Sequence, residues 1–396
     1  MLQGKLSSYY VDLHIHIGRT RTNRPVKITA SNQLTLPNIM EESVLRKGMD
    51  MLGVIDAQSP EVLDELEESV ICGDAHEYKD GGIRYKDKVT ILLGAELEVY
   101  DEFSQGPIHV LCFLPTIESM RYFSRWCSGK MKNIHLSSQR IYVTGKNLQQ
   151  VVKKMGGWFI PAHVFTPFKS LYGKGVEVSL QEVFDPSLID AIELGLSADT
   201  TLAGKLIELN PYTFISNSDA HSTSKIAREH QVVQLAKPTF VEMGKALKNE
   251  NGRRIVKNIG LDPRLGKYHQ TVCRVCNTKV DDGYCLHEHR EKIVKGVYER
   301  IQELSAAQKT LCARIEAEEK RPPYIHHVPL QFIPGVGPKT LQKLLQSHTE
   351  MEIVHELELE ELVNIVPIKI ALLIIKARSG KLLIEEGGGG TYGKIK

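Results

Sequence analysis

Two histidines stand two residues apart in the segment DLHIH at positions 12–16. On a β-strand this spacing places both imidazoles on one face, so both can reach the same metal ion. The pattern alone is weak, because strands carry such pairs by chance. Its weight comes from other residues able to bind metals at the ends of apolar segments, namely Asp56, Glu96, His109, His163, Asp219 and His221.

Each of these residues also has an ordinary structural interpretation. Glu96 can be a helix cap or an ion-pair partner, His109 and His163 can be core histidines with satisfied hydrogen bonds, and Asp56 can form a turn. Together, however, they place many polar groups where an isolated charge is costly unless it is paired or bound to metal. We therefore expect them to form one site that includes His14 and His16.

The ligand types predict the chemistry. Imidazole with carboxylate, and no thiolate nearby, suits zinc, manganese or iron, and a carboxylate can bridge two ions about 3.5–4 Å apart. Such ions activate water near neutral pH and neutralise charge on phosphoryl oxygens. The sequence contains no Walker-type phosphate loop and no GxSxG elbow. It therefore predicts metal-dependent hydrolysis of phosphoesters.

The elements that must position these residues alternate between strand and helix. Strands are expected at residues 10–14, 51–55, 90–98, 109–114, 158–163, 191–193 and 214–218, with helices at 38–47, 147–155 and 201–209 between some of them. Regular alternation predicts a parallel sheet or a barrel. Several of the reactive residues lie at or just after strand ends, which is where α/β barrels carry their active sites.

The segments DLHIH, GAELEV, PIHVLCF, IPAHV and SDAH, in this order over residues 10–221, resemble the motifs of the PHP (polymerase and histidinol phosphatase) superfamily. The resemblance implies an α/β fold, a distorted (β/α)7 barrel with two or three divalent ions, zinc, manganese or magnesium. It assigns as ligands His14, His16, Glu96, His109, His163, Asp219 and His221, with Glu96, Asp219 and His221 as catalytic residues. The family usually has Asp-His after the second strand, whereas this chain has Asp56-Ala57. Either Asp56 takes the place of the missing histidine, or one metal is bound differently.

A second metal site is expected further along the chain. Cys273 and Cys276 form a CxxC half-site, in which a short turn aims both sulfurs at one point. Cys285 follows, with His287 or His289 as the fourth ligand, so we expect one structural zinc ion; the alternative is a reduced loop without metal. The remaining cysteines stand alone and no secretory signal is apparent, which predicts a cytoplasmic protein.

The segment FIPGVGPKTLQKLL at 332–345 resembles a helix-hairpin-helix DNA-binding motif. Gly335 and Gly337 allow a tight turn whose backbone N–H groups can hold a phosphate, and Lys339 and Lys343 add positive charge. Residues 361–381 look like a second, degenerate copy, with proline in place of the glycines. The alternative is a glycine turn between ordinary helices.

Positive charge is also concentrated beside the first histidine pair, although the net charge of the whole chain is only +2. Arg19, Arg21, Arg24 and Lys27 follow His16 within a dozen residues. Such a run is usually a solvated loop. Beside a phosphoesterase site it can also grip the phosphate backbone of DNA.

Four regions are expected: a metal-dependent barrel at 1–262, a zinc knuckle and long connecting helix at 263–320, a tandem helix-hairpin-helix module at 321–385, and a flexible tail at 386–396. The long helix should span residues 291–319 and end before the prolines that follow it. This order of regions resembles the endonuclease Q family.

The resemblance implies a DNA-repair endonuclease that nicks 5′ of deaminated bases (uracil, hypoxanthine, xanthine) and abasic sites, using metal-activated water. Damaged DNA is the expected partner, and the sequence leaves open whether a sliding clamp is a second one. We expect a monomer that does not associate with membranes. A pocket between the barrel mouth and residues 273–319 would take the flipped base, with Trp158, Phe165, Phe168 and Tyr172 as candidate stacking residues. The alternatives are a small-molecule phosphatase and a DNA-binding scaffold whose metal site has decayed.

Overall fold

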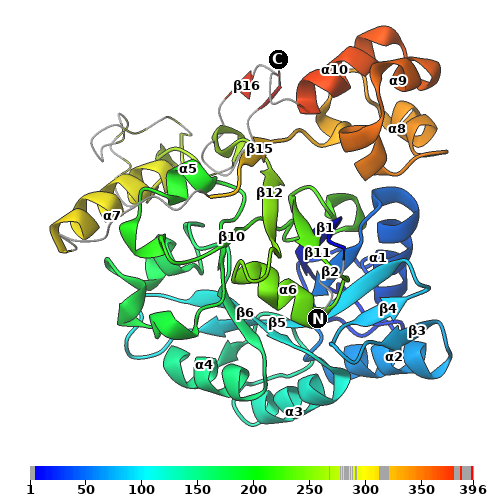
Figure 1. Ribbon diagram of the computed structural model, residues 1–396. Coiled ribbons are helices and arrows are strands. Elements are labelled where there is room, and N and C mark those ends of the chain that lie inside the picture. The colour runs from blue at the N-terminus through cyan, green and yellow to red at the C-terminus, as the bar shows by residue number, and fades with distance from the viewer. Residues whose placement is uncertain are drawn as a thin grey trace.

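The computed structural model describes residues 5–266, 268–276, 278, 280, 285, 287, 289, 292–311, 321–378, 384–385 and 394–395. Its centre is a mixed β-sheet, in which eleven strands are found among these residues (Figure 1). The main path runs β15-β12-β11-β1-β2-β5-β4-β3, while β6 joins β5 to β8 and β7 pairs with β5. The bounds are β1 Ser7–Ile15, β2 Met51–Val54, β3 Ala75–Glu77, β4 Ile83–Tyr85, β5 Val89–Val99, β6 Ile108–Leu114, β7 Arg140–Ile141, β8 Trp158–Pro161, β11 His230–Leu235, β12 Arg254–Gly260 and β15 Tyr324–His326.

The expectation of a parallel sheet is only partly correct. β1, β2 and β5 are parallel neighbours, but β6 is antiparallel to both β5 and β8, and β11 is antiparallel to both β1 and β12. The segment between β5 and β6, residues 100–107, contains no helix. A parallel pair needs a crossover of about a dozen residues or more, so this short connection produces an antiparallel pair.

Two short strands, β9 (Ile192–Glu193) and β10 (Phe214–Ile215), continue the path beyond β8 as a parallel pair. The amide of Asp190 donates to the carbonyl of Phe159 at 3.0 Å, next to β8. At the other side, the Asn258 amide group of β12 donates to the carbonyl of Phe214 at 2.9 Å. These contacts link the short pair to β8 on one side and to β12 on the other.

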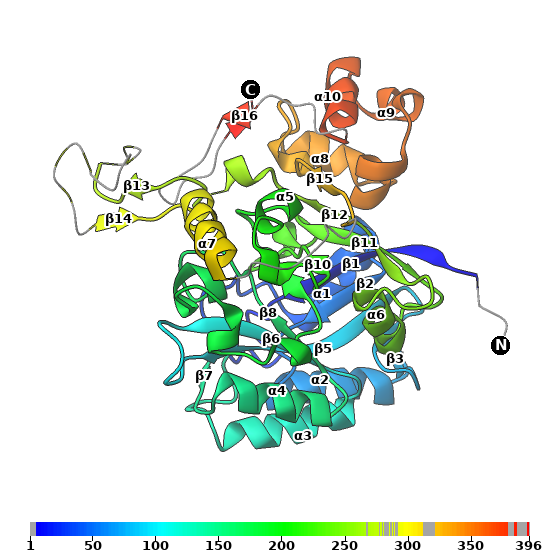
Figure 2. The ribbon, with the colours of Figure 1, turned by 60° about the vertical axis from the view of Figure 1, so that its left-hand side comes forward.

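Helices cover the outside of the sheet. They are α1 Leu36–Glu42, α2 Pro60–Ile71, α3 Ile117–Ser128, α4 Gly145–Lys154, α5 Thr200–Ala203 and α6 Phe240–Leu247. α2, α3 and α4 lie along the same outer side (Figures 1 and 2). Neighbouring residues of a strand face opposite sides of the sheet. Met51 of β2 therefore lies in an apolar core with residues of α6, whereas the next residue, Leu52, lies in the larger core under the outer helices.

The chain then forms a small hairpin of β13 (Val272–Cys273) and β14 (Ile293–Val294), followed by helix α7 (Val297–Leu311). The long helix expected from residue 291 therefore begins later, because Ile293 and Val294 pair with β13 instead. Residues 312–320, where that helix was expected to end, lie outside the described residues.

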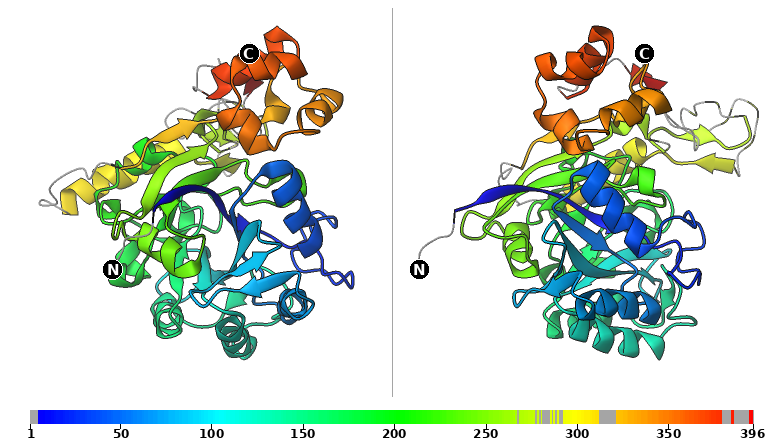
Figure 3. Two further views of the ribbon diagram at one scale, coloured as in Figure 1. Left: turned by 45° about the vertical axis from the view of Figure 1, so that its right-hand side comes forward. Right: turned by 90° about the vertical axis from the view of Figure 1, so that its right-hand side faces the viewer.

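A helical module follows, with α8 (Pro338–Leu344), α9 (Leu359–Ile365) and α10 (Ile368–Arg378) around its own apolar core. It stands on one side of the sheet (Figure 3). Most of the predicted tail, residues 386–396, lies outside the described residues. Its described part, β17 (Lys394–Ile395), pairs with β16 (Ile384–Glu385). None of the described helices is long and apolar enough to cross a membrane.

Histidines mark the contact between this module and the sheet. His355 of the module lies 3.2 Å, Nε2 to Nε2, from His230 of β11, and its ring stacks on Tyr10 of β1. The ring centroid of His327 lies 6.1 Å from that of His230 and 6.1 Å from that of His355. An ion pair between Lys47 and Glu350 adds a second link. The module is thus held against the sheet by buried polar contacts.

Candidate metal centre

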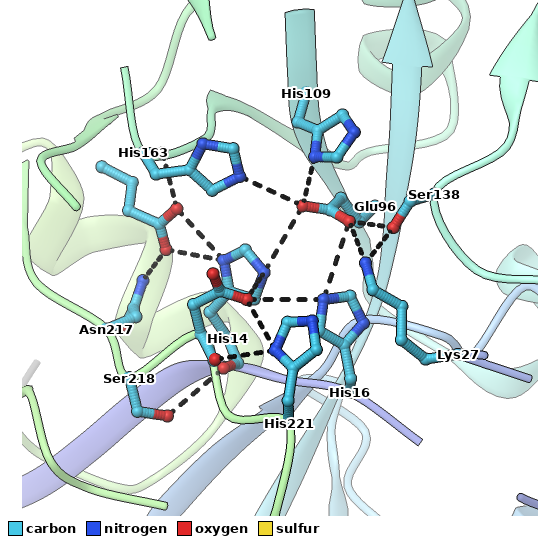
Figure 4. Close-up of polar contacts among 12 residues, drawn as sticks. His14, His16, Lys27, Glu96, His109, Ser138, His163, Asn217, Ser218 and His221 are labelled. Atoms are coloured by element: carbon cyan, nitrogen blue, oxygen red, sulfur yellow. Dashed lines mark hydrogen bonds and ion pairs between the residues drawn. The ribbon is translucent and has the colours of Figure 1, made fainter. Parts of the chain in front are cut away.

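The strand ends bring the predicted ligands together (Figure 4). His14 lies near the end of β1 and His16 directly follows it, after an irregularity in the pairing with β2. Glu96 projects from β5, and His109 from the adjacent β6. The remaining three, His163, Asp219 and His221, lie on loops after β8 and β10.

These seven side chains form three overlapping groups. In each group, potential ligand atoms lie within 4.8 Å of one another. The groups are His14–His16–Glu96, His16–Asp219–His221 and Glu96–His109–His163. Glu96 therefore belongs to two groups, and so does His16. This overlap suits two or three ions that share bridging or neighbouring ligands.

The two carboxylates stand at the centre of the cluster. Glu96 Oε1 is 2.9 Å from His109 Nδ1 and 3.3 Å from His163 Nε2. Glu96 Oε2 is 3.6 Å from His16 Nε2. On the other side, Asp219 Oδ1 is 3.4 Å from His14 Nε2, 3.5 Å from His16 Nε2 and 3.4 Å from His221 Nδ1.

The hydrogen bonding of the histidines fits a metal site. The Nε2 atoms of His14 and His16 are buried, face the two carboxylates and have no hydrogen-bond partner. A buried polar atom left unpaired costs about 1–3 kcal/mol. Two ligand atoms each about 2.1 Å from one ion stand about 3.0–3.4 Å apart, which is close to the separations seen here. Divalent ions would satisfy these atoms.

The electrostatics of the site favour added positive charge. Burial would lower the pKa of His14, but Glu193 and Asp219 raise it to about 10. Burial would likewise raise the pKa of Glu96, but His109 and Lys27 hold it well below its usual value. The carboxylates thus remain ionised and attract positive charge to the imidazoles, which metal ions would supply.

A second layer of carboxylates orients the histidines. Glu193 Oε1 lies 2.9 Å from His14 Nδ1, and Asp56 Oδ2 lies 3.1 Å from His16 Nδ1. Asp56 also accepts from the backbone N–H of Ile17 at 2.7 Å and is absent from the three ligand groups. Carboxylates in this position fix the ring orientation and tautomer of a metal-binding histidine. Sequence reasoning missed Glu193, because one acidic residue at a strand end carries no spacing signal.

Asp12, the first residue of DLHIH, fixes the loop that carries Asp219. Its Oδ1 accepts from the backbone N–H of Ser218 at 3.1 Å, and its Oδ2 accepts from Ala227 at 2.9 Å. Asp219 has a φ of 45° and His163 a φ of 32°. Left-handed backbone at residues other than glycine costs free energy and persists where the surroundings enforce it, often at functional sites.

The basic segment after His16 divides into two parts. Lys27 reaches into the cluster, with Nζ 3.1 Å from Glu96 Oε2. Arg21 and Arg24 instead pair with Glu68 and Glu61 of α2, and Arg19 donates to Asn32. Lys27 therefore contacts the candidate metal centre, whereas the three arginines pair with residues outside it.

The cysteine cluster also has the geometry of a metal site. Cys273, Cys276, Cys285 and His289 offer ligand atoms within 4.8 Å of one another. The Sγ atoms of Cys276 and Cys285 are 3.4 Å apart, and Cys273 Sγ is 3.6 Å from His289 Nδ1. Tetrahedral zinc with Zn–S of about 2.3 Å separates its ligands by about 3.5–3.8 Å. Of the two histidines left open by the sequence, His289 completes the group.

A cavity of about 200 Å³ opens beside the metal centre. Its lining includes His163, Asp219, Ser197, Arg228 and Tyr268. Tyr268 stands in the segment that leads toward the cysteine cluster.

The stacking residues predicted from closeness to His163 are largely elsewhere. Trp158 is only 5% exposed and stacks on Phe240 of α6 at 3.8 Å, inside an apolar core. Phe165 and Tyr172 are buried and stack on each other. The prediction failed for these three because neighbours in sequence point to different sides of a strand or turn. Phe168 is half-buried and contacts Tyr268.

Comparison with known proteins identifies relatives of the chain. No family model matches the chain. It is 54% identical to the uncharacterised protein YqxK of Bacillus subtilis over 394 residues, which cover 99% of this chain and 100% of YqxK. An uncharacterised protein of Methanocaldococcus jannaschii is 36% identical over 257 residues, which are 58% of this chain and 31% of that protein.

Two solved structures resemble nearly the whole chain. The lesion-specific endonuclease PfuEndoQ of Pyrococcus furiosus superposes with a TM-score of 0.83 and 30% identity, covering 98% of this chain and 95% of its own. Endonuclease Q in complex with a 27-mer duplex substrate with an abasic lesion at the active site gives a TM-score of 0.80 and 29% identity, with 98% and 96% covered.

The α/β fold and its buried cluster of histidines and carboxylates define a protein with a candidate metal centre. Within that class, the chain belongs to the endonuclease Q family.

Proposed function

We propose that this protein is a metal-dependent DNA endonuclease that nicks the phosphodiester bond 5′ of deaminated bases and abasic sites. The observation that carries the proposal is the convergence of seven potential ligands into three overlapping groups, in a chain whose relative is a lesion-specific endonuclease. The ligands are His14, His16, Glu96, His109, His163, Asp219 and His221. We further infer that the curved sheet is the distorted barrel of PHP proteins.

The centre suits phosphodiester hydrolysis. Ions bound there would neutralise charge on the phosphoryl oxygens and lower the pKa of a water molecule. Asp219 is 32% exposed by its side chain, whereas Glu96 is buried. Asp219 and the partly exposed His221 therefore face an incoming substrate, while Glu96 holds the cluster from behind. Lys27, with its ammonium group at Glu96, adds a fixed positive charge beside the phosphate.

The adjoining cavity suits a single flipped base. Its volume of about 200 Å³ is below the roughly 300–1,000 Å³ of sites for drug-sized ligands. Tyr268 supplies a ring for stacking, and Ser197 and Arg228 supply polar atoms. Flipping costs least for mispaired or missing bases, which favours damaged sites.

The helical module suits contact with the DNA backbone. Gly335 has a φ of 88°, a conformation that favours glycine, and it forms the turn before α8. Gly337, Lys339 and Lys343 are exposed on the same segment. Helices α9 and α10 follow, with Pro367 between them. We infer that the module is a tandem helix-hairpin-helix that holds phosphates without reading sequence.

The decisive experiment uses end-labelled duplexes that contain one uracil, one hypoxanthine, one abasic site or only normal bases. Purified protein with divalent metal should nick the three damaged duplexes and leave 3′-hydroxyl and 5′-phosphate ends. Asp219→Asn should lower the rate by roughly a thousandfold or more, and the exposed Asp74→Asn serves as the matched control. Equal nicking of normal DNA would contradict lesion specificity. Hydrolysis of histidinol phosphate without nicking would favour the phosphatase alternative.

A further inference from the structure

An arginine stands between two exposed tyrosines where β5 and β7 end. The guanidinium carbon of Arg140 lies 4.7 Å from the ring centroid of Tyr100 and 5.3 Å from that of Tyr142. Tyr100 is 39% exposed and Tyr142 is 51% exposed, and Arg140 is exposed as well. We call these three residues the aromatic–arginine ladder.

The geometry of β5 connects the ladder to the metal centre. Alternate residues of a strand share one face, so Glu98 lies on the same face as the potential metal ligand Glu96, and its Oε2 atom is 3.8 Å from Nε2 of His109. Arg140 is the partner of Glu98 in the parallel pairing of β7 with β5 and shares that face. The contact between Arg140 and Tyr100 extends the row outward from the metal centre.

The segment before Arg140 makes a second connection. Ser137 Oγ lies 3.1 Å from Nδ1 of His16. The next hydroxyl, that of Ser138, donates to Glu96 and accepts from Lys27 at 2.5 Å. Arg140 follows two residues later. The ladder therefore begins beside side chains that touch the metal ligands.

The chemistry of the ladder suits a nucleotide. Arg140 donates to the carbonyl of Tyr100 and forms no ion pair with a carboxylate of the described residues, since Glu98 binds Lys169 at 2.9 Å instead. A guanidinium stacked on aromatic rings keeps N–H groups at its edge that can bind phosphate. Exposed aromatic rings beside positive charge are the typical means of holding single nucleotides, because each base can stack on a ring.

The ladder and the cavity of the proposed lesion site lie on different sides of the ligand cluster. The cavity is lined by His163, Asn217 and Tyr268. Figure 4 shows His163 and Asn217 on one side of the cluster and Ser138, which leads to the ladder, on the other. A strand whose lesion nucleotide enters the cavity, with its 5′ phosphate at the metal centre, therefore continues in the 5′ direction toward the ladder.

We propose that the aromatic–arginine ladder binds the nucleotide on the 5′ side of the cleaved bond, the nucleotide that leaves with the 3′-hydroxyl group. Tyr100 and Tyr142 stack on its base, and Arg140 binds its phosphate. The inference rests on the proposed function and deepens it by assigning a second nucleotide subsite. Because this subsite does not touch the lesion, its contribution to affinity is the same for every damaged substrate.

The test compares Arg140→Ala/Tyr142→Ala with Arg125→Ala/Tyr122→Ala, a matched pair on α3 whose guanidinium carbon lies 4.6 Å from the tyrosine ring. Binding to fluorescein-labelled duplexes with one uracil or one abasic site is measured by anisotropy, in an Asp219→Asn background that prevents turnover. The ladder variant should bind both duplexes about tenfold or more weakly. The slope of log K against log salt should fall by roughly 1. The control should match the unsubstituted protein.

Conservative variants separate the two kinds of contact. Arg140→Lys should restore the salt slope, because it keeps the positive charge at the phosphate. Tyr142→Phe should restore the affinity, because it keeps the ring. Equal melting temperatures of the two double variants would show that the loss of binding does not come from unfolding.

Photo-cross-linking locates the bound nucleotide without any substitution in the ladder. One abasic duplex carries 5-iodouracil at the nucleotide on the 5′ side of the cleaved bond, and a second carries it on the 3′ side of the lesion. Mass spectrometry should find cross-links to Tyr100 or Tyr142 with the first duplex and none with the second.

Unchanged affinity in the ladder variant, or cross-links to these tyrosines from the 3′ side alone, would overturn the ladder inference while normal nicking by the wild type keeps the endonuclease proposal. Binding that depends on the ladder without any nicking would overturn the endonuclease proposal alone. Absence of DNA binding by the unsubstituted protein would overturn both.

Discussion

The carboxylate of Glu193 binds the Nδ1 atom of His14 at 2.9 Å, so the Nε2 atom of the same ring faces Glu96 and Asp219. Glu193 is itself held by the side-chain amide of Asn217 at 2.7 Å and by the backbone N–H of His163 at 2.8 Å. This one side chain therefore ties together the loops after β8 and β10 and the end of β1.

Glu193→Gln should weaken metal binding by roughly 10–100-fold, because the neutral amide no longer favours the required orientation and basicity of His14. The nicking rate at limiting metal should fall in parallel and recover partly at high metal concentration. Metal titration followed by nicking assays measures both. Glu177→Gln, at an exposed glutamate outside the ligand groups, is the control, and equal metal affinity in the two variants would contradict the positioning role.

The two histidines near Cys285 should differ in their effect on zinc. His289→Ala should lower the zinc content by about one ion per chain, because His289 completes the tetrahedral group. His287→Ala should keep that zinc, since His287 lies outside the group and stacks on His289. Metal analysis after dialysis against a weak chelator distinguishes them. Zinc loss in the His287 variant alone would reverse the assignment.

Tyr268→Ala should lower the cleavage of DNA that contains a damaged base more than the cleavage of DNA that contains an abasic site. Stacking of a base on an aromatic ring contributes about 1–3 kcal/mol, so kcat/KM for uracil-containing DNA should fall about tenfold or more. Cleavage at an abasic site should change little, because no base is present to stack.

The exposed Tyr122 of α3 offers the matched control, Tyr122→Ala. A uniform loss on all substrates in the Tyr268 variant would indicate a structural role for this residue instead.

The histidines between the sheet and the helical module should make stability depend on pH. Burial lowers the pKa of His230 to about 3 and of His327 to about 3, and it also lowers the pKa of His355. A lowered folded-state pKa stabilises the fold fully above the ordinary value near 6.5, and this contribution is lost as pH falls toward 3. The loss at pH 4 is on the order of 3 kcal/mol for each of His230 and His327.

His355→Gln keeps a neutral hydrogen-bond donor toward His230 and removes one titrating ring. The charged groups around the cluster, Lys47, Lys257, Arg378, Glu350 and Glu356, remain the same. The melting temperature of this variant should therefore fall less steeply between pH 6.5 and 4 than that of the wild type. Because both proteins carry the same metal centre, parallel curves would exclude the histidine cluster as the cause.

Much of the metal centre could be predicted from the sequence, because its ligands come from strand ends that form recognisable motifs. The spacing of His14 and His16 places them on one face of a strand. Glu96 lies in the motif GAELEV and Asp219 in the motif SDAH. Two of the orienting residues could not be predicted. Glu193 and Asp12 act through contacts across the sheet, and nothing in their local sequence distinguishes them from ordinary acidic residues.

The ion-pair partners of the basic segment could not be predicted from the sequence either. Arg21 and Arg24 pair with glutamates of α2 some forty residues later, which depends on how α2 packs beside the loop.

The direction of β6, in contrast, could have been predicted. The absence of a helix between β5 and β6 is visible in the sequence, and it already implies an antiparallel pair.

The sharing of Glu96 and His16 between ligand groups has a thermodynamic consequence. An ion that settles in one position alters the orientation and charge of ligands that the next ion needs. The affinities of the positions are therefore linked, and by the same factor in either direction. Metal loading should follow a cooperative isotherm instead of independent steps, so the fraction of active protein will not track total bound metal in a straight line.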